Sequence, residues 1–190
     1  MLAAGQAGVE STLAEAKELG DRLPSEAPMQ PDWTREKKSF WQWDPSRSLL
    51  ASIRAYQHAR SSGGLLAGLV RRLAVLRHHF WSIVTGAEIP LNTQLGGGLL
   101  MPHPNGIVIH PEVRIGVNCM IFQQVTLGIR DNPDVPWVGD HVDIGAGAKI
   151  LGGVRIGDHA RIGANSVVLH DVAASTTVVG APARPVGQGR

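Results

Sequence analysis

Aromatic residues are scarce in this 190-residue chain, which has three Phe, one Tyr and five Trp. This composition suits a narrow core of aliphatic and small side chains rather than one filled by rings. The single cysteine, Cys119, excludes a disulfide framework, and its place in a regular apolar pattern predicts a core residue. The net charge of +2 is too small to predict a nucleic-acid partner, although the isoelectric point is near 9.0.

Long apolar runs are missing as well. No stretch reaches the length of a membrane span, and the amino terminus lacks the charged-then-apolar pattern of a signal peptide. We therefore expect a cytoplasmic location, and the length leaves room for one domain or one and a half.

A period of six residues is the strongest signal that the sequence contains. Ten aliphatic residues follow this period in two series, which are Ile109, Ile115, Ile121 and Leu127, then Val138, Ile144, Ile150, Ile156, Ile162 and Val168. Four positions after each of them, small or β-branched residues occur at Val113, Cys119, Val125, Val142, Ala148, Val154, Ala160, Ser166 and Val172. The one exception is Asp131, inside the interruption between the two series.

Such a period fits neither a helix nor a simple alternating strand. Each hexapeptide is too short to bury its own apolar residues, so successive units have to stack. Three hexapeptides per turn give a triangular parallel β-coil, with aliphatic and small residues inside and Gly, Asn and Asp at the corners. We predict this coil over residues 87–180, followed by a tail over residues 181–190.

The residues before the coil predict helices. Within a flexible segment, residues 1–32, one face of a short helix is predicted by Val9, Leu13, Ala16, Leu19 and Leu23. Residues 33–86 form a predicted helical region, in which Asp44-Pro45 opens one helix and residues 65–84 form a second. Arginines interrupt the apolar residues of the second helix, so it could contact a membrane surface. Capping the open end of the coil is the simpler interpretation.

His103 is the residue that breaks the repeat most informatively. It lies six residues before Ile109 and so takes a place that the repeat would give to an aliphatic residue. A polar ring there needs hydrogen-bond partners or a chemical role. The residues alone leave catalysis and a structural role both open.

From residue 44 to about residue 187, the sequence resembles the serine acetyltransferase family of hexapeptide-repeat acyltransferases. The similarity is carried, in matching order and spacing, by Asp44-Pro45, residues 85–89, His103 with residues 106–108, and residues 124–128, 144–152 and 179–184. The resemblance implies a left-handed parallel β-helix behind an α-helical N-terminal region. It also implies an O-acetyltransferase that moves an acetyl group from acetyl-CoA to a hydroxyl.

The resemblance also assigns roles. His103 matches the general base, and Glu88, fifteen positions earlier, matches the acidic residue that orients this base. Asp44 matches a residue that contacts the acceptor, and Pro102 and Asn105 are predicted to border the acceptor beside His103.

Acetyl-CoA, as co-substrate, is expected in a groove between neighbouring subunits of a homotrimer. The residues predicted to contact it are Thr126, Gly128, Ala146, Ala164 and Arg184. Two of these, Ala146 and Ala164, are 18 residues apart and should stack, leaving room for the pantetheine arm.

Departures from the family pattern favour a different acceptor. Serine-specific members carry Asp, Arg and His where ungapped alignment places Pro102, Asp134 and Val135, so groups that grip a small zwitterion are missing. We therefore predict a saccharide hydroxyl in polysaccharide biosynthesis as the acceptor, with Trp137 stacking on the sugar. Serine acetylation in cysteine biosynthesis is the alternative. Because the chain lacks the family's longer tail, no complex with cysteine synthase is expected.

Two other classes compete with this prediction. His141 and His159 are 18 residues apart and should stack at a corner, as in hexapeptide coils that bind zinc. No third histidine completes such a site, so no metal is expected. A non-catalytic scaffold is the second alternative, and the presence of both His103 and Glu88 argues against it.

Overall fold

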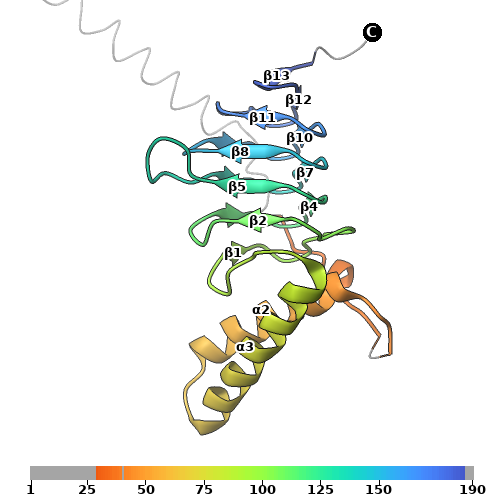
Figure 1. Ribbon diagram of the computed structural model, residues 1–190, viewed down its shortest axis with the longest axis vertical. Coiled ribbons are helices and arrows are strands. Elements are labelled where there is room, and N and C mark those ends of the chain that lie inside the picture. Colours follow the sequence, from red (N-terminus) through yellow and green to blue (C-terminus); the bar gives the residue numbers. More distant parts are fainter. Residues whose placement is uncertain (1–28, 40, 187–190) are drawn as a thin grey trace, which may run out of the picture.

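The computed structural model describes residues 29–39 and 41–186. In it, a helical hairpin stands at one end of a three-sided β-coil (Figure 1). The predicted helix over residues 9–23 lies outside the described residues. No helix among the described residues is long and apolar enough to cross a membrane.

The helical region contains a short 3₁₀ helix, η1 (Trp33–Glu36), and two α-helices, α2 (Pro45–Ser61) and α3 (Leu65–Thr85). The predicted start of α2 is confirmed, because the Asp44 side chain accepts a hydrogen bond from the backbone N–H of Arg47 and Pro45 is the first helical residue. Helix α3 ends at Gly86, whose φ of 64° is a left-handed conformation that glycine adopts at little cost.

The coil is built from very short strands that form three parallel sheets, one on each face. The first sheet contains β1 (Gln94–Leu95), β3 (Arg114–Ile115), β6 (Trp137–Val138) and β9 (Arg155–Ile156). The second contains β2 (Val108–Ile109), β5 (Thr126–Gly128), β8 (Lys149–Leu151) and β11 (Val167–Val168). The third contains β4 (Met120–Ile121), β7 (Asp143–Ile144), β10 (Arg161–Ile162), β12 (Thr177–Val179) and β13 (Arg184–Pro185), the last pair being antiparallel.

The predicted interior of the coil is confirmed. All ten aliphatic residues of the repeat are at most 4% exposed, and the nine residues four positions later are at most 7% exposed. Cys119 is fully buried among them, and this burial raises the pKa of its thiol to about 12. Asp131, the exception to the pattern, lies exposed in the loop between β5 and β6.

Successive turns approach so closely that some corners exclude side chains. A Cβ added to Gly116 would lie 2.5 Å from the carbonyl oxygen of Gly139 in the next turn. The corners at Asp140 and Asp158 bond across turns, because the Oδ1 atom of each accepts a 2.7 Å hydrogen bond from the backbone of the preceding turn. Gly, Asn and Asp were predicted at the corners. Asn118 and Asn165 have positive φ as glycines do, whereas at these two corners the residues with positive φ are His141 and His159.

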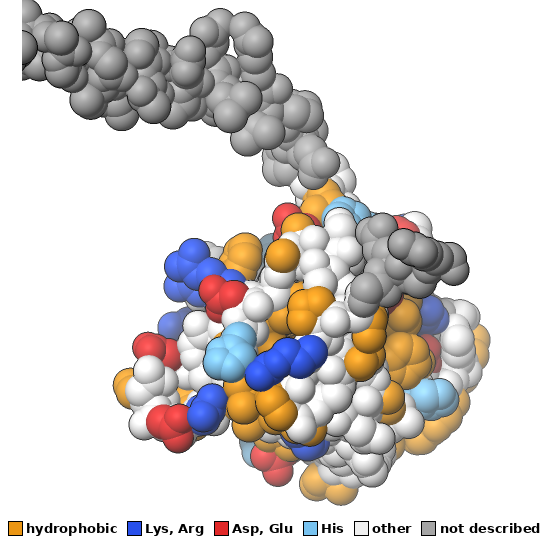
Figure 2. Space-filling view, turned by 90° about the horizontal axis from the view of Figure 1, so that it is seen from above, with side chains coloured by type: hydrophobic (Ala, Val, Ile, Leu, Met, Phe, Trp, Pro, Cys, Tyr) orange, Lys and Arg blue, Asp and Glu red, His pale blue; other side chains and the backbone are white. Residues whose placement is uncertain are grey.

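The open end of the coil is covered by α2 rather than by α3. Leu49, Leu50 and Ile53 of α2 are buried in one cluster with the coil interior. Helix α3 buries only Ala74 and Thr85 and packs the partly buried Trp81 against this cluster, so α2 rather than the second helix supplies most of the cap. Figure 1 shows the hairpin extending beyond the first turn. Figure 2 views the opposite end, where hydrophobic and charged side chains are interspersed.

Candidate active site

The candidate site lies where the helical hairpin meets the first turns of the coil. A pocket of about 470 Å³ is lined there by Trp43, Asp44, Pro45, Ser46, Val84, Thr85, Pro102, His103, Pro104 and Asn105. The structure therefore brings together four of the predicted site residues, Asp44, Pro102, His103 and Asn105, although 58 residues separate the first from His103. His103 is exposed on the bend that leads into β2, so its imidazole is accessible to a ligand.

The Asp44 carboxylate makes two contacts at the edge of this pocket. Its Oδ1 atom accepts the 3.0 Å hydrogen bond that caps α2, and its Oδ2 atom lies 3.4 Å from the Arg47 guanidinium. The helix start thus fixes the carboxylate at the edge of the pocket. Both carboxylate oxygens keep lone pairs that can accept a hydrogen bond from a ligand.

The family resemblance pairs Glu88 with His103 as the acid that orients the base, but among the described residues no hydrogen bond connects the two side chains. Its backbone forms a parallel bridge with Val108, through hydrogen bonds to Ile107 and from Ile109 of 2.8 and 2.9 Å. The Glu88 side chain is exposed, and within the described ranges no hydrogen bond joins it to His103. Its role in orienting the base stays a prediction.

The residues predicted to contact CoA fall on two faces of the coil. Thr126 and Gly128 lie on β5, in the same sheet as β2, next to the bend that carries His103. Ala146 and Ala164 stack as predicted, since the pairing of β7 with β10 continues to them and the backbone N–H of Asn165 bonds the Ala146 carbonyl at 2.8 Å. Arg184 lies on β13, at the far end of the third sheet.

Lys149 is a candidate that the sequence interpretation missed. Its ammonium donates to the Gln124 carbonyl at 2.6 Å and to the Thr126 hydroxyl at 3.1 Å. It therefore places a positive charge beside a residue assigned to CoA. The available signal was its place on a strand face, because a lysine that alternates with buried Ala148 and Ile150 must project outward.

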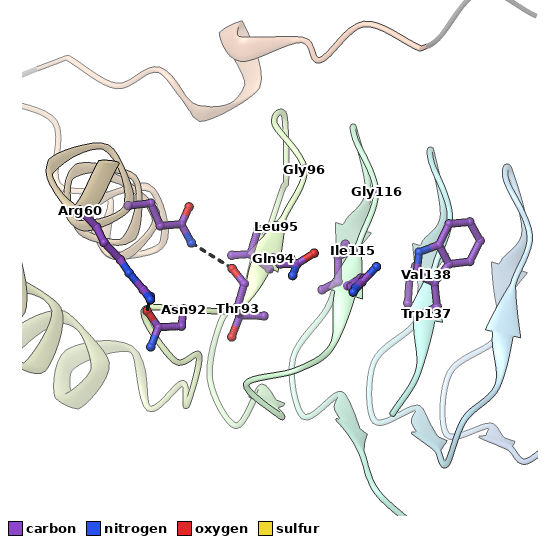
Figure 3. Close-up of a pocket in the computed structure, with 12 residues that line it drawn as sticks. Arg60, Asn92, Thr93, Gln94, Leu95, Gly96, Ile115, Gly116, Trp137 and Val138 are labelled. Atoms are coloured by element: carbon purple, nitrogen blue, oxygen red, sulfur yellow. Dashed lines mark hydrogen bonds between the residues drawn. The ribbon is translucent and has the colours of Figure 1, made fainter. Parts of the chain in front are cut away.

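Trp137 does not belong to the His103 pocket. It lies on β6 in the first sheet, where Arg114 and Arg155 occupy the paired positions on either side. Figure 3 shows it in a different pocket, together with Thr93 and Gln94. Within one chain it therefore lies outside the pocket that holds His103, and its contact with the acceptor stays a prediction.

The predicted stack of His141 and His159 is confirmed. Their rings are 5.0 Å apart and inclined by 19°, and the Asn118 amide lies 3.1 Å from Nε2 of His141. Among the residues that the structure describes, there is no group of three or more His, Cys, Asp or Glu side chains placed to hold a metal ion.

Comparison with known proteins shows which proteins the chain is similar to. Residues 136–170 match the family model described as bacterial transferase hexapeptide (six repeats). Three curated relatives named serine acetyltransferase come from Synechococcus elongatus, Staphylococcus xylosus and Mycobacterium tuberculosis. The Synechococcus protein is 42% identical over 114 residues, which cover 58% of this chain and 47% of the relative. The Staphylococcus protein is 46% identical over 110 residues, covering 55% of this chain and 50% of the relative. The Mycobacterium protein is 40% identical over 121 residues, covering 62% of this chain and 53% of the relative.

Solved structures agree. A serine acetyltransferase in complex with CoA has a TM-score of 0.63 and 35% identity, covering 76% of this chain and 58% of that one. The Neisseria gonorrhoeae serine acetyltransferase in complex with serine has a TM-score of 0.60 and 37% identity, covering 75% of this chain and 55% of that one.

The chain is thus a left-handed parallel β-helix built from hexapeptide repeats, with an α-helical N-terminal region. Its resemblance to the serine acetyltransferase-like family is confirmed. It spans about half the length of the curated relatives it matches.

The predicted saccharide acceptor is wrong. The relatives and solved neighbours are named serine acetyltransferases, and one neighbour is a complex with serine. The prediction relied on Asp134 and Val135 as replacements for acceptor-binding groups. In the structure, these two residues line a hollow with Glu112 and Arg155, away from His103 in the same chain. Within one chain, Asp134 and Val135 therefore do not line the pocket that holds His103.

Proposed function

We propose that this protein is an acetyl-CoA-dependent serine O-acetyltransferase. The observation that carries the proposal is the single pocket that unites His103 with Asp44 across 58 residues of sequence. The relatives at 40–46% identity that are named for this activity support it. A cytoplasmic location is part of the proposal, whereas the expectation of no cysteine synthase complex gains no support from these relatives.

The chemistry needs one base and an activated acyl donor. An imidazole nitrogen of His103 accepts the proton of the serine hydroxyl while that oxygen attacks the thioester carbonyl carbon. The C–O bond forms, the C–S bond breaks, and the imidazolium returns the proton to the departing CoA thiolate. Asp44 attracts the serine ammonium group, and Glu88 steadies the imidazolium.

We also propose that the active form is a homotrimer with CoA bound between subunits. The stacked Ala146 and Ala164 support this, because small side chains leave the backbone amides of adjacent turns accessible to the pantetheine arm. Thr126, Gly128 and Lys149 lie on the sheet that continues from His103, which suits the reactive end of CoA.

The proposal is tested by acetyl transfer with purified full-length chain. We expect release of the CoA thiol to depend on L-serine, with kcat/KM above about 10⁴ M⁻¹s⁻¹, and mass spectrometry to detect O-acetylserine. L-Alanine is the matched control, because it lacks only the hydroxyl. Thiol release that is no faster with serine than with alanine would rule out this acceptor.

Substitution of Asp44 separates its two roles. Asp44→Asn keeps an N-cap and removes the charge, so we expect KM for serine to rise about tenfold while stability changes by less than about 0.5 kcal/mol. Asp44→Ala should raise KM similarly and also lower the free energy of unfolding by about 1 kcal/mol. Steady-state kinetics and urea unfolding measure both effects. An unchanged KM for serine in both variants would exclude Asp44 from the acceptor site.

A further inference from the structure

Helix α3 presents a continuous row of large apolar side chains to solvent. The row, called here the α3 stripe, consists of Leu65, Leu69, Leu73, Leu76, Phe80 and Ile83. These residues recur every three or four positions and therefore lie on one face of the helix. They are 97%, 54%, 51%, 67%, 54% and 82% exposed.

The side chains are arranged opposite to those of an ordinary surface helix. The small Ala67 and Ala74 face inward, whereas the leucines face outward. An amphipathic helix gains its stability by burying its large apolar face. An exposed row of this length marks an interaction surface rather than scattered surface leucines.

The charge around the stripe is of one sign. Residues 45–85 contain six arginines and no Asp or Glu. Arg72 and Arg77 of α3 flank the stripe on its two sides. Both are exposed, and neither forms an ion pair within the part of the chain that the structure describes. A partner with an apolar face and acidic edges would complement this surface.

The chain itself contains such a segment. In residues 9–23, Val9, Leu13, Ala16, Leu19 and Leu23 have the same three- and four-residue spacing as the stripe. The segment holds four acidic and two basic residues. At helical spacing, Glu10 and Glu15 flank the apolar face on its two sides, and Glu18 and Asp21 lie farther round the helix.

We propose that residues 9–23 pack as a helix on the α3 stripe, with their acidic edges beside its arginines. A tethered segment has an effective concentration in the millimolar range, which favours it over a free partner. A second copy's stripe fits less well, because it would bring two sets of arginines together. A lipid surface would match the charge only where anionic headgroups are present.

A thiol placed on the stripe reports whether it is covered. Leu73→Cys introduces one reactive thiol in the full-length chain. Cys119 stays silent, because it is buried and its pKa is raised to about 12. The probe is Ellman's reagent at pH 7.5, and Leu76→Cys serves as a second reporter position if the first variant does not fold.

Two matched double substitutions add the same charge to opposite faces of residues 9–23. Leu13→Asp with Leu19→Asp puts two carboxylates on the apolar face, and Ser11→Asp with Ala14→Asp puts two on the polar face. We expect the first pair to speed thiol modification at residue 73 by at least about tenfold, and the second pair to leave the rate unchanged.

Equal rates in all three backgrounds would overturn the proposal. Protection that is insensitive to both substitutions but rises with protein concentration would assign the stripe to a second copy. Protection that appears only with phosphatidylserine vesicles would assign it to a lipid surface. Each of these results rejects residues 9–23 as the occupant.

Discussion

Replacement of His103 by alanine should lower kcat/KM for acetyl transfer by roughly 10²–10⁴-fold while the coil stays folded. The expected loss is large because the serine hydroxyl is a poor nucleophile until its proton is taken. The side chain is exposed and lies outside the buried cluster, so its removal leaves no cavity in the core.

The matched control is His170→Ala, an exposed histidine near the other end of the coil. It should keep the activity of the parent chain. Circular dichroism and thermal unfolding verify that both variants fold. If His103→Ala retained parental kcat with serine, the pocket would not be the site of proton transfer and the proposed mechanism would fail.

The second large effect concerns stability. Ile150→Ala removes a fully buried side chain from β8, in the middle of the coil. We expect the free energy of unfolding to fall by about 2–5 kcal/mol, because the variant loses both the transfer free energy of the side chain and the packing around the cavity. Urea unfolding followed by circular dichroism measures this change.

Ile129→Ala is the control for that prediction. Ile129 follows β5 in the loop and is 50% exposed, so its truncation should change stability by less than about 0.5 kcal/mol. Similar losses for both variants would mean that the interior of the coil is not packed as described.

The fold could be predicted because each position of the repeat determines whether its side chain points into or out of the coil. In a turn of three hexapeptides, the same two positions of each unit face inward, and all nineteen residues of the two patterns are buried. The helix start at Asp44-Pro45 was predictable for a similar reason, since a cap is a local hydrogen bond between neighbours in sequence.

The site was predictable only in part. The family pattern identified His103 and Asp44, and the structure unites them in one pocket. The sequence spacing of Glu88 and His103 could not predict whether their side chains form a hydrogen bond. Spacing determines the backbone register of the two residues but not their side-chain rotamers. Trp137 lies on β6 in the first sheet, whereas His103 precedes β2 of the second sheet, so a contact of both with one acceptor stays a prediction.

Helix α3 shows a different limit of sequence reasoning. A period of three to four residues predicts that one face is apolar, but it does not say which element covers that face. The sequence interpretation assigned the face to the coil, and the structure turns it outward. The assignment failed because Leu49, Leu50 and Ile53 of α2 already occupy the open end of the coil.

The parallel pairing of the coil has a consequence for how the chain folds. Partners such as Asp143 and Arg161 are 18 residues apart, and around the loop after β5 the separation rises only to 23, as between Thr126 and Lys149. Each turn therefore closes a loop of nearly equal length, and the entropy cost of closure is nearly the same for every turn. A formed turn offers strands with which the adjacent turns can pair, so folding can begin at one turn and propagate along the coil in either direction. Hydrogen exchange should accordingly be fastest in the end turn that has no helix covering it.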